Sequence, residues 1–157
     1  MVEVHKLRVE LATQTVLHYR VEVTLLEVVA AILVVLVTEI TVLTLLAVAE
    51  VTPQDIVYDL GAGDGVISIT AAKRFGARSV GIEYDQKMAD FARKNTQLAG
   101  VADKVKIIRG DIFVEDFSEA TVVTLYLLPE LNLQLRPTLM KMKPGTRIVS
   151  NTFDMVE

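Results

Sequence analysis

The stretch DLGAGDG, from Asp59 to Gly65, decides the fold of this chain. It follows a short, mostly apolar run, Asp55–Leu60, and precedes a segment with helical spacing, Val66–Phe75. A strand that enters a glycine turn and continues as a helix is the first unit of an open α/β sheet. The sequence therefore predicts a ligand-binding turn at the carboxyl end of a buried strand.

The segments after the glycine turn alternate between strand and helix patterns. Strands are predicted over Ser79–Glu83, Val105–Ile108, Thr121–Leu127 and Arg147–Ser150. Helices are predicted over Gln86–Ala99, which Asp85 caps, and over Glu130–Lys143, which Pro137 interrupts. This alternation predicts an α/β domain with a Rossmann-like, mostly parallel sheet and helices on both faces.

The N-terminal third of the chain has a different pattern. Val2–Leu11 and Leu17–Leu25 alternate in hydrophobicity around a polar turn, which predicts a β-hairpin. We assign residues 1–50 to an N-terminal region that holds this hairpin and two apolar segments. Residues 51–157 are predicted to form the α/β domain. The N-terminal region is either part of that same domain or a separate region joined to it by the chain.

The apolar part of the N-terminal region admits two interpretations. A membrane span needs about 20 apolar residues, and residues 28–49 reach that length only with Glu39 near the middle. A carboxylate there costs about 2.5–3.5 kcal/mol on insertion scales. We therefore expect two buried segments, Val28–Val37 and Ile40–Ala49, in a cytoplasmic protein. Membrane association through residues 28–49 is the alternative.

Composition narrows the classes of function. The chain of 157 residues has a net charge of -4, which gives no basic surplus for binding nucleic acid. It contains no cysteine, so disulfides, thiolate metal sites and cysteine nucleophiles are excluded. The two histidines, His5 and His18, are far from the glycine turn, and the acids near the turn occur singly. No metal site is predicted.

The acids of the glycine turn indicate the type of cofactor. Gly61, Gly63 and Gly65 give a G-x-G-x-G pattern, whose third glycine comes one residue earlier than in dinucleotide-binding turns. Asp59 and Asp64 would repel a pyrophosphate by about 4 kcal/mol per charge pair at close range. S-adenosylmethionine carries a sulfonium and an ammonium group and no phosphate. The turn therefore favours S-adenosylmethionine over NAD.

Two further acids extend this predicted site. Glu83 ends the second strand, where an acid accepts hydrogen bonds from ribose hydroxyls, and Asp111 follows the third strand, within reach of an adenine amino group. Ile112 or Phe113 would then lie against the adenine ring. The predicted cofactor-binding residues are Asp59, Gly61, Ala62, Gly63, Asp64, Gly65, Glu83, Tyr84, Asp111 and Ile112.

Two segments resemble known methyltransferases. VYDLGAGDGVISITAAKRFGARSVGIE resembles the first two motifs of class I S-adenosylmethionine-dependent methyltransferases. EATVVTLYLLPELNLQLRPTLMKMKPGTRIVSNTFDM resembles the later half of a small family of archaeal and bacterial protein lysine methyltransferases. This resemblance implies a seven-stranded methyltransferase sheet and methyl transfer to the ε-amine of a lysine in a protein substrate.

The chain departs from that family in three places. LVTEITVLTLL lacks the prolines that family members have before the first strand, and Val66 stands where an arginine is common. The family also continues into two final antiparallel strands, whereas this sequence ends at Glu157. Either those strands are missing, or the N-terminal hairpin completes the sheet beside Arg147–Ser150, since an exposed apolar edge strand invites aggregation.

The substrate side of the site is predicted at the ends of the fourth and fifth strands. The candidate residues there are Thr124, Tyr126, Leu128, Pro129, Glu130, Asn151 and Phe153. We assign Tyr126 and Asn151 to the methyl-transfer site; a core aromatic within a strand is the alternative for Tyr126. A motif of the Asn-Pro-Pro-Tyr type is absent, which favours protein over nucleic acid as substrate. The competing functions are a non-catalytic, truncated or rearranged cofactor-binding domain and an NAD-dependent oxidoreductase.

Overall fold

The computed structural model describes residues 6–10 and 20–151 of the chain. The chain divides into two compact units, Met1–Thr41 and Val42–Glu157. The boundary between them falls inside the first helix, α1 (Leu25–Val48). The last turns of α1 therefore belong to the same unit as the glycine turn.

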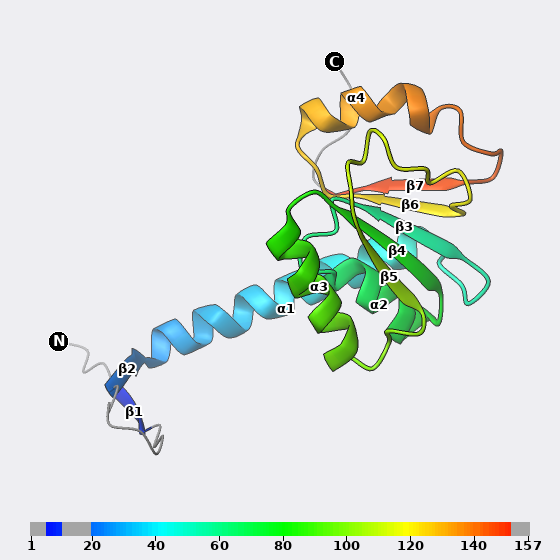
Figure 1. Ribbon diagram of the computed structural model, residues 1–157. Helices are drawn as coiled ribbons and strands as arrows, with labels where there is room; N and C mark the ends of the chain where they lie inside the picture. The colour runs from blue at the N-terminus through cyan, green and yellow to red at the C-terminus, as the bar shows by residue number, and fades with distance from the viewer. Residues whose placement is uncertain (1–5, 11–19, 152–157) are drawn as a thin grey trace. The chain divides into compact units, whose positions relative to one another are not determined.

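The larger unit contains a five-stranded parallel sheet with the strand order β5-β4-β3-β6-β7 (Figure 1). Its strands are β3 (Ile56–Leu60), β4 (Arg78–Glu83), β5 (Val105–Arg109), β6 (Val122–Leu125) and β7 (Arg147–Ser150). All four neighbouring pairs are parallel. The chain leaves β3 toward β4 and β5 on one side and toward β6 and β7 on the other. This change of direction is the point where open α/β sheets bind ligands.

Helices cover both faces of the sheet, as the sequence predicts. They are α2 (Val66–Phe75), α3 (Gln86–Leu98) and α4 (Pro129–Leu139). In Figure 1, α4 lies on one face, and α2 and α3 lie on the other. Asp85 caps α3 by accepting a hydrogen bond from the backbone N–H of Met88, which confirms the predicted cap. The predicted Rossmann-like fold is confirmed.

The strands alternate between two apolar cores. On one face, Val57 and Val122 pack with Ile67 of α2 and with Val42 and Leu46 of α1. The other face holds a second core beneath α4, made of Tyr58, Leu60, Ile82, Phe117, Ala120, Val123, Leu125, Leu135 and Leu139. Neighbouring residues of one strand thus point into different cores, as the pleat requires.

The predicted N-terminal hairpin is present, but its predicted place in the sheet is wrong. The strands β1 (Lys6–Glu10) and β2 (Arg20–Thr24) pair antiparallel and form a two-stranded sheet of their own. Within the part of the chain that the structure describes, the five-stranded sheet of the larger unit contains neither of them, and its edge strand β7 is paired with β6 alone. The predicted turn between β1 and β2 lies outside the described residues.

The prediction of two separate buried apolar segments is wrong for the first, Val28–Val37, whereas the second, Ile40–Ala49, is partly buried through Val42, Leu46 and Ala49. Residues 25–48 form one continuous helix, α1, through Thr38 and Glu39. Neither residue stops a helix, and the Thr38 hydroxyl donates to the Val34 carbonyl 3.0 Å away, which keeps this polar side chain bonded within the helix. Apart from the half-buried Val28, the side chains from Leu25 to Ile40 are exposed. The apolar run therefore forms a helix, but most of the side chains in its first part are not buried by the protein.

Two predicted element ends shift in the structure. The helix predicted to reach Lys143 ends at Leu139, two residues after Pro137. Proline lacks the N–H that would bond four residues back, and short turns from Thr138 and Leu139 replace the helix. The strand predicted to reach Leu127 ends at Leu125. The residues beyond Leu125 are thereby free to line the carboxyl edge of the sheet.

Candidate functional site

The glycine turn between β3 and α2 requires its glycines. Gly61, Gly63 and Gly65 have φ values of 81°, 55° and 85°, which side chains rarely adopt. The backbone N–H groups of Gly61 and Ala62 both donate to the Ile82 carbonyl over 2.9 Å. These bonds fix the turn against β4, so its backbone lies at the carboxyl edge of the sheet.

Two contacts hold the turn from the other elements. A Cβ at Gly61 would lie 2.6 Å from Cδ2 of Leu127, so the loop after β6 packs directly on the turn. From α3, the Asn95 side-chain amide donates to the Asp64 carbonyl over 2.9 Å. No local sequence pattern predicts either contact, because the two residues are 66 positions apart in the first pair and 31 in the second.

Asp59 lies beneath the turn rather than open to it. Its side chain is 2% exposed, and Oδ1 accepts a hydrogen bond from the Thr124 hydroxyl at 2.8 Å. Burial is the largest cause that raises the pKa of Asp59 to about 7; the nearby carboxylates of Asp64 and Glu83 act in the same direction, and the hydrogen bond from Thr124 opposes them. Thr124, predicted on the substrate side, instead supports Asp59 from within the core. Phe153, predicted on the same side, lies outside the residues that the structure describes.

Glu83 is held in one orientation by backbone groups. Its Oε2 accepts from the Gly63 N–H at 2.8 Å, and its Oε1 accepts from the Asp85 N–H at 2.9 Å. Each carboxylate oxygen has a second lone pair that can accept another hydrogen bond. The carboxylate thus links the glycine turn to the β4–α3 connection and presents acceptors at the edge of the sheet.

The residues after β4 and β5 form the far side of the site. Tyr84 is exposed, and the Arg109 guanidinium lies 5.6 Å from the centre of its ring. Asp111 accepts a hydrogen bond from the Phe113 N–H at 2.9 Å through Oδ1. Ile112 is half-buried and packs partly on the core beneath α4, so only part of its surface remains for a ligand.

The two predicted catalytic residues follow neighbouring strands. Tyr126 comes directly after β6 and is 60% exposed, so the interpretation as a core aromatic within a strand is wrong. Asn151 comes directly after β7, and its backbone N–H donates to the Leu125 carbonyl over 2.9 Å. The structure therefore brings both residues to the same end of the sheet as Asp59 and Glu83.

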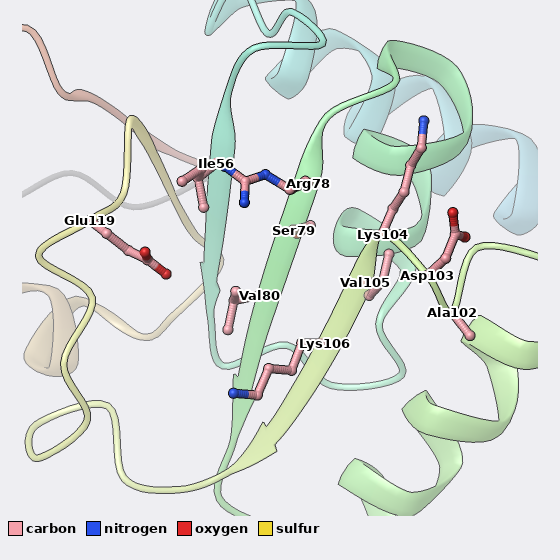
Figure 2. Close-up of a pocket in the computed structure, with 10 residues that line it drawn as sticks. All are labelled: Ile56, Arg78, Ser79, Val80, Ala102, Asp103, Lys104, Val105, Lys106 and Glu119. Carbon is pink, nitrogen blue, oxygen red and sulfur yellow. The ribbon is translucent and has the colours of Figure 1, made fainter.

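A separate cleft lies at the opposite, amino ends of the strands. Figure 2 shows its lining residues, Ile56, Arg78, Ser79, Val80, Ala102, Asp103, Lys104, Val105, Lys106 and Glu119. Its volume is about 180 Å³. None of the predicted cofactor-binding residues lines it. Within residues 6–10 and 20–151, no cluster of three or more histidine or acidic side chains could hold a metal ion.

Comparisons with known proteins agree with this geometry. Residues 59–157 match the family model of the ANTKMT methyltransferase domain. A protein-lysine N-methyltransferase of Saccharolobus islandicus is 47% identical over 113 residues, which are 71% of this chain and 70% of that protein. A ribosomal protein L11 methyltransferase of Desulfitobacterium hafniense is 33% identical over 89 residues, 57% of this chain but only 28% of that protein.

Solved structures show the same fold. An RNA methyltransferase from Salinibacter ruber, in complex with S-adenosyl-L-homocysteine, has a TM-score of 0.71 and 55% identity over 73% of this chain and 75% of that one. An S-adenosylmethionine-dependent methyltransferase from Geobacter sulfurreducens, with the same ligand, has a TM-score of 0.63 and 27% identity. That match covers 70% of this chain and 46% of the other.

Proposed function

This chain belongs to the ANTKMT methyltransferase domain family, and from that membership we propose that it methylates lysine ε-amines of a protein, using S-adenosylmethionine. The name of the 47% identical relative from Saccharolobus islandicus supports the choice of lysine. The observation in this structure that carries the proposal is the Glu83 carboxylate, locked onto the glycine turn above the buried Asp59.

The site suits a cationic cofactor without phosphate. Glu83 would accept hydrogen bonds from the ribose, and Asp111 would accept from the adenine amino group. Asp59 and Asp64 would attract the positive charge of the amino-acid part, to which the glycine backbone allows close approach. S-adenosylmethionine supplies a methyl group on a sulfonium when it is bound.

The protein residues contribute by positioning and by excluding water. A lysine can attack only as the neutral amine, and a partly apolar environment lowers its pKa. Tyr126, Leu128 and Asn151, at the ends of β6 and β7, would provide such an environment once a bound substrate covers them. We assign Tyr126 and Asn151 the role of orienting the amine. Alignment of the amine nitrogen with the methyl group supplies most of the rate enhancement in such a transfer.

RNA is the second candidate substrate, because the related Salinibacter ruber structure carries the name RNA methyltransferase. The acids near the glycine turn disfavour it, since phosphates would be repelled from Asp64, Glu83, Asp85 and Asp111. Lysine therefore remains the primary proposal.

Calorimetry and methyl transfer together test the proposed function. S-adenosylhomocysteine should bind to the purified chain and NAD should not. Tritiated S-adenosylmethionine should then label lysine-rich proteins, and amino-acid analysis should recover methyllysine. Binding of NAD alone would reject the cofactor assignment. Binding of S-adenosylhomocysteine without transfer would favour a non-catalytic domain, and label in RNA alone would reject lysine.

We further propose that the domain is cytoplasmic and that α1 attaches it to a lipid membrane. Residues 25–48 have the length and composition of a helix that can cross a membrane, with a mean hydropathy of 2.6. Apolar side chains cover all sides of its exposed part, and a bilayer can accommodate such a helix where a single protein groove cannot.

The buried end of α1 limits how deeply it can insert. Val42 and Leu46 belong to the core of the larger unit, so at most residues 25–41 are available to lipid. These 17 residues span about 25 Å, less than the hydrocarbon thickness of about 30 Å. Association from one side is therefore favoured over a complete crossing.

Vesicle flotation tests the membrane proposal. The wild-type chain should float with phosphatidylcholine vesicles, and Leu33→Glu combined with Val34→Glu should abolish flotation. Leu98→Glu changes an equally exposed leucine in α3 and should float like the wild type. Equal flotation of the double variant and the wild type would reject α1 as the attachment.

A further inference from the structure

Two apolar side chains stand exposed beside the predicted methyl-transfer site. Tyr126 is 60% and Leu128 is 61% exposed, whereas Leu125 before them is fully buried. Leu127, between them, packs inward on Gly61 and on the core beneath α4. Because side chains alternate along an extended segment, Tyr126 and Leu128 point to the same, outer side.

The strand order sets these two residues apart from the cofactor-binding acids. Glu83 and Asp111 follow β4 and β5, on one side of β3. Tyr126 and Leu128 follow β6, on the other side of β3. A cofactor whose ribose and adenine lie over β4 and β5, and whose amino-acid part lies at the β3 turn, leaves the β6 side for the substrate.

The surroundings of the pair complement a basic segment. Glu130, in the first turn of α4, is exposed two residues after Leu128. Asp64, at the adjoining glycine turn, is also exposed. Lysine and its basic neighbours would be attracted to these carboxylates, while the apolar pair offers contact to an uncharged side chain.

We propose that Tyr126 and Leu128 form an apolar platform that selects substrates in which a large apolar residue is next to the target lysine. The platform rests on the proposed lysine methylation, because it uses the same site. It is continuous with the glycine turn through the Leu127–Gly61 contact, so a side chain bound there would hold the lysine at a fixed place. Losing such a contact reduces kcat/KM by about tenfold or more.

Two peptides of equal charge test the platform. They differ only in the residue next to a single lysine, which is leucine in one and alanine in the other. The wild-type chain should methylate the leucine peptide with a kcat/KM about tenfold higher, mainly through KM. Leu128→Ala should bring the ratio between the peptides close to one; Tyr126→Ala should do the same and should also slow methylation of both peptides, because Tyr126 is assigned to orient the amine.

Leu98→Ala is the matched control, because Leu98 is exposed at the end of α3 and takes no part in the site. It should keep the wild-type ratio, and binding of S-adenosylhomocysteine to each variant reports that the domain is folded. Equal methylation of both peptides by the wild type would overturn the platform while lysine methylation stands. Methylation of RNA and of neither peptide would overturn both.

Discussion

Thr124 donates its hydroxyl proton to Asp59 across the β3–β6 pair, where the two residues are directly opposite each other in register. The bond is 2.8 Å long and both residues are buried. A neutral hydroxyl stabilises a carboxylate less than a cation would, so burial still dominates the ionisation of Asp59. The parallel sheet thus holds a carboxyl group that ionises near neutral pH.

The first prediction concerns the pH dependence of Asp59. Its pKa is about 7 in the folded domain against a usual value of 3.8, so the unfolded chain loses this proton at lower pH. The free energy of unfolding should therefore fall between about pH 4 and pH 7, by up to about 4 kcal/mol, and this contribution should be constant above pH 7. Urea unfolding across pH 4–8 measures it.

Asp59→Asn removes the ionisation while keeping an oxygen that can accept from Thr124. We expect the variant to lose this pH dependence, so that it exceeds the wild type in stability at pH 8. Its affinity for S-adenosylhomocysteine should fall more at pH 8 than at pH 6, because only the ionised carboxylate attracts the ligand's ammonium group. Asp103→Asn, at an exposed acid, should follow the wild type; a retained slope in Asp59→Asn would exclude Asp59 as its source.

The second prediction compares two glycines with similar backbone angles. Gly61→Ala must place a Cβ 2.6 Å from Leu127, whereas Gly100→Ala meets nothing within 4 Å, although φ is 81° at Gly61 and 70° at Gly100. Gly100→Ala should cost about 1–2 kcal/mol in unfolding free energy for the backbone alone. Gly61→Ala should cost more, because the Leu127 side chain, which also packs on the core beneath α4, must move to make room for the Cβ. Adding Leu127→Ala to Gly61→Ala should relieve the clash; equal losses at the two glycines would disprove the contact.

Glu83→Gln is the third prediction. The amide oxygen can accept one of the two backbone hydrogen bonds, but the other contact meets an NH₂ donor. We expect the affinity for S-adenosylhomocysteine to fall by about 10- to 100-fold, because bonds to a charged acceptor contribute about 1.5–3 kcal/mol. Calorimetry measures the loss, with Asp103→Asn as a control that should bind normally. Unchanged affinity in Glu83→Gln would remove Glu83 from the site.

The fourth prediction concerns Arg147, which joins β7 to the end of α1. Its guanidinium donates to the Ala49 and Glu50 carbonyls at 2.8 and 2.7 Å and pairs with the buried Asp55. Burial opposes ionisation of Asp55, but hydrogen bonds from Thr121 and Thr52 and the charge of Arg147 lower its pKa. The stabilisation is present at neutral pH and is lost as the pH falls through the lowered pKa of Asp55.

Arg147→Ala should lower the free energy of unfolding by about 2–4 kcal/mol at pH 7, because it leaves a buried carboxylate without its cation. The loss of stability in acid should also begin at higher pH in this variant. The exposed Arg93–Asp90 pair provides the comparison, where Asp90→Asn should leave the free energy of unfolding nearly unchanged. Similar losses in the two variants would contradict the role assigned to Arg147.

The sequence was sufficient to predict the sheet and its carboxyl edge. Short apolar strands end at Leu60, Glu83 and Arg109, and at or just after each end there is a local signal, a glycine or an acid. The cap at Asp85 and the glycine turn also depend on local geometry alone. Features that depend on residues close in sequence were therefore predicted correctly, and the ends of parallel strands bring them together.

Features that depend on distant residues were missed. The burial of Asp59 requires Thr124 opposite it, and the tight turn at Gly61 requires Leu127 above it. An apolar sequence does not show whether protein covers its surface, which is why Val28–Val37 was expected to be buried although its side chains, apart from the half-buried Val28, are exposed. The predicted pairing of the hairpin with β7 was wrong for the same reason. Alternating hydrophobicity indicates that a segment is a strand, but it does not indicate which strand it pairs with.

The bond from Arg147 to Ala49 connects residues 98 positions apart. During synthesis at about 5–20 residues per second, the carbonyls at the end of α1 emerge about 5–20 s before the guanidinium that binds them. The partners of Leu46 in β3, α2 and β6 also arrive later than α1. The apolar helix is therefore complete on the ribosome well before its domain can fold, and during that interval a chaperone or a membrane has the first access to it.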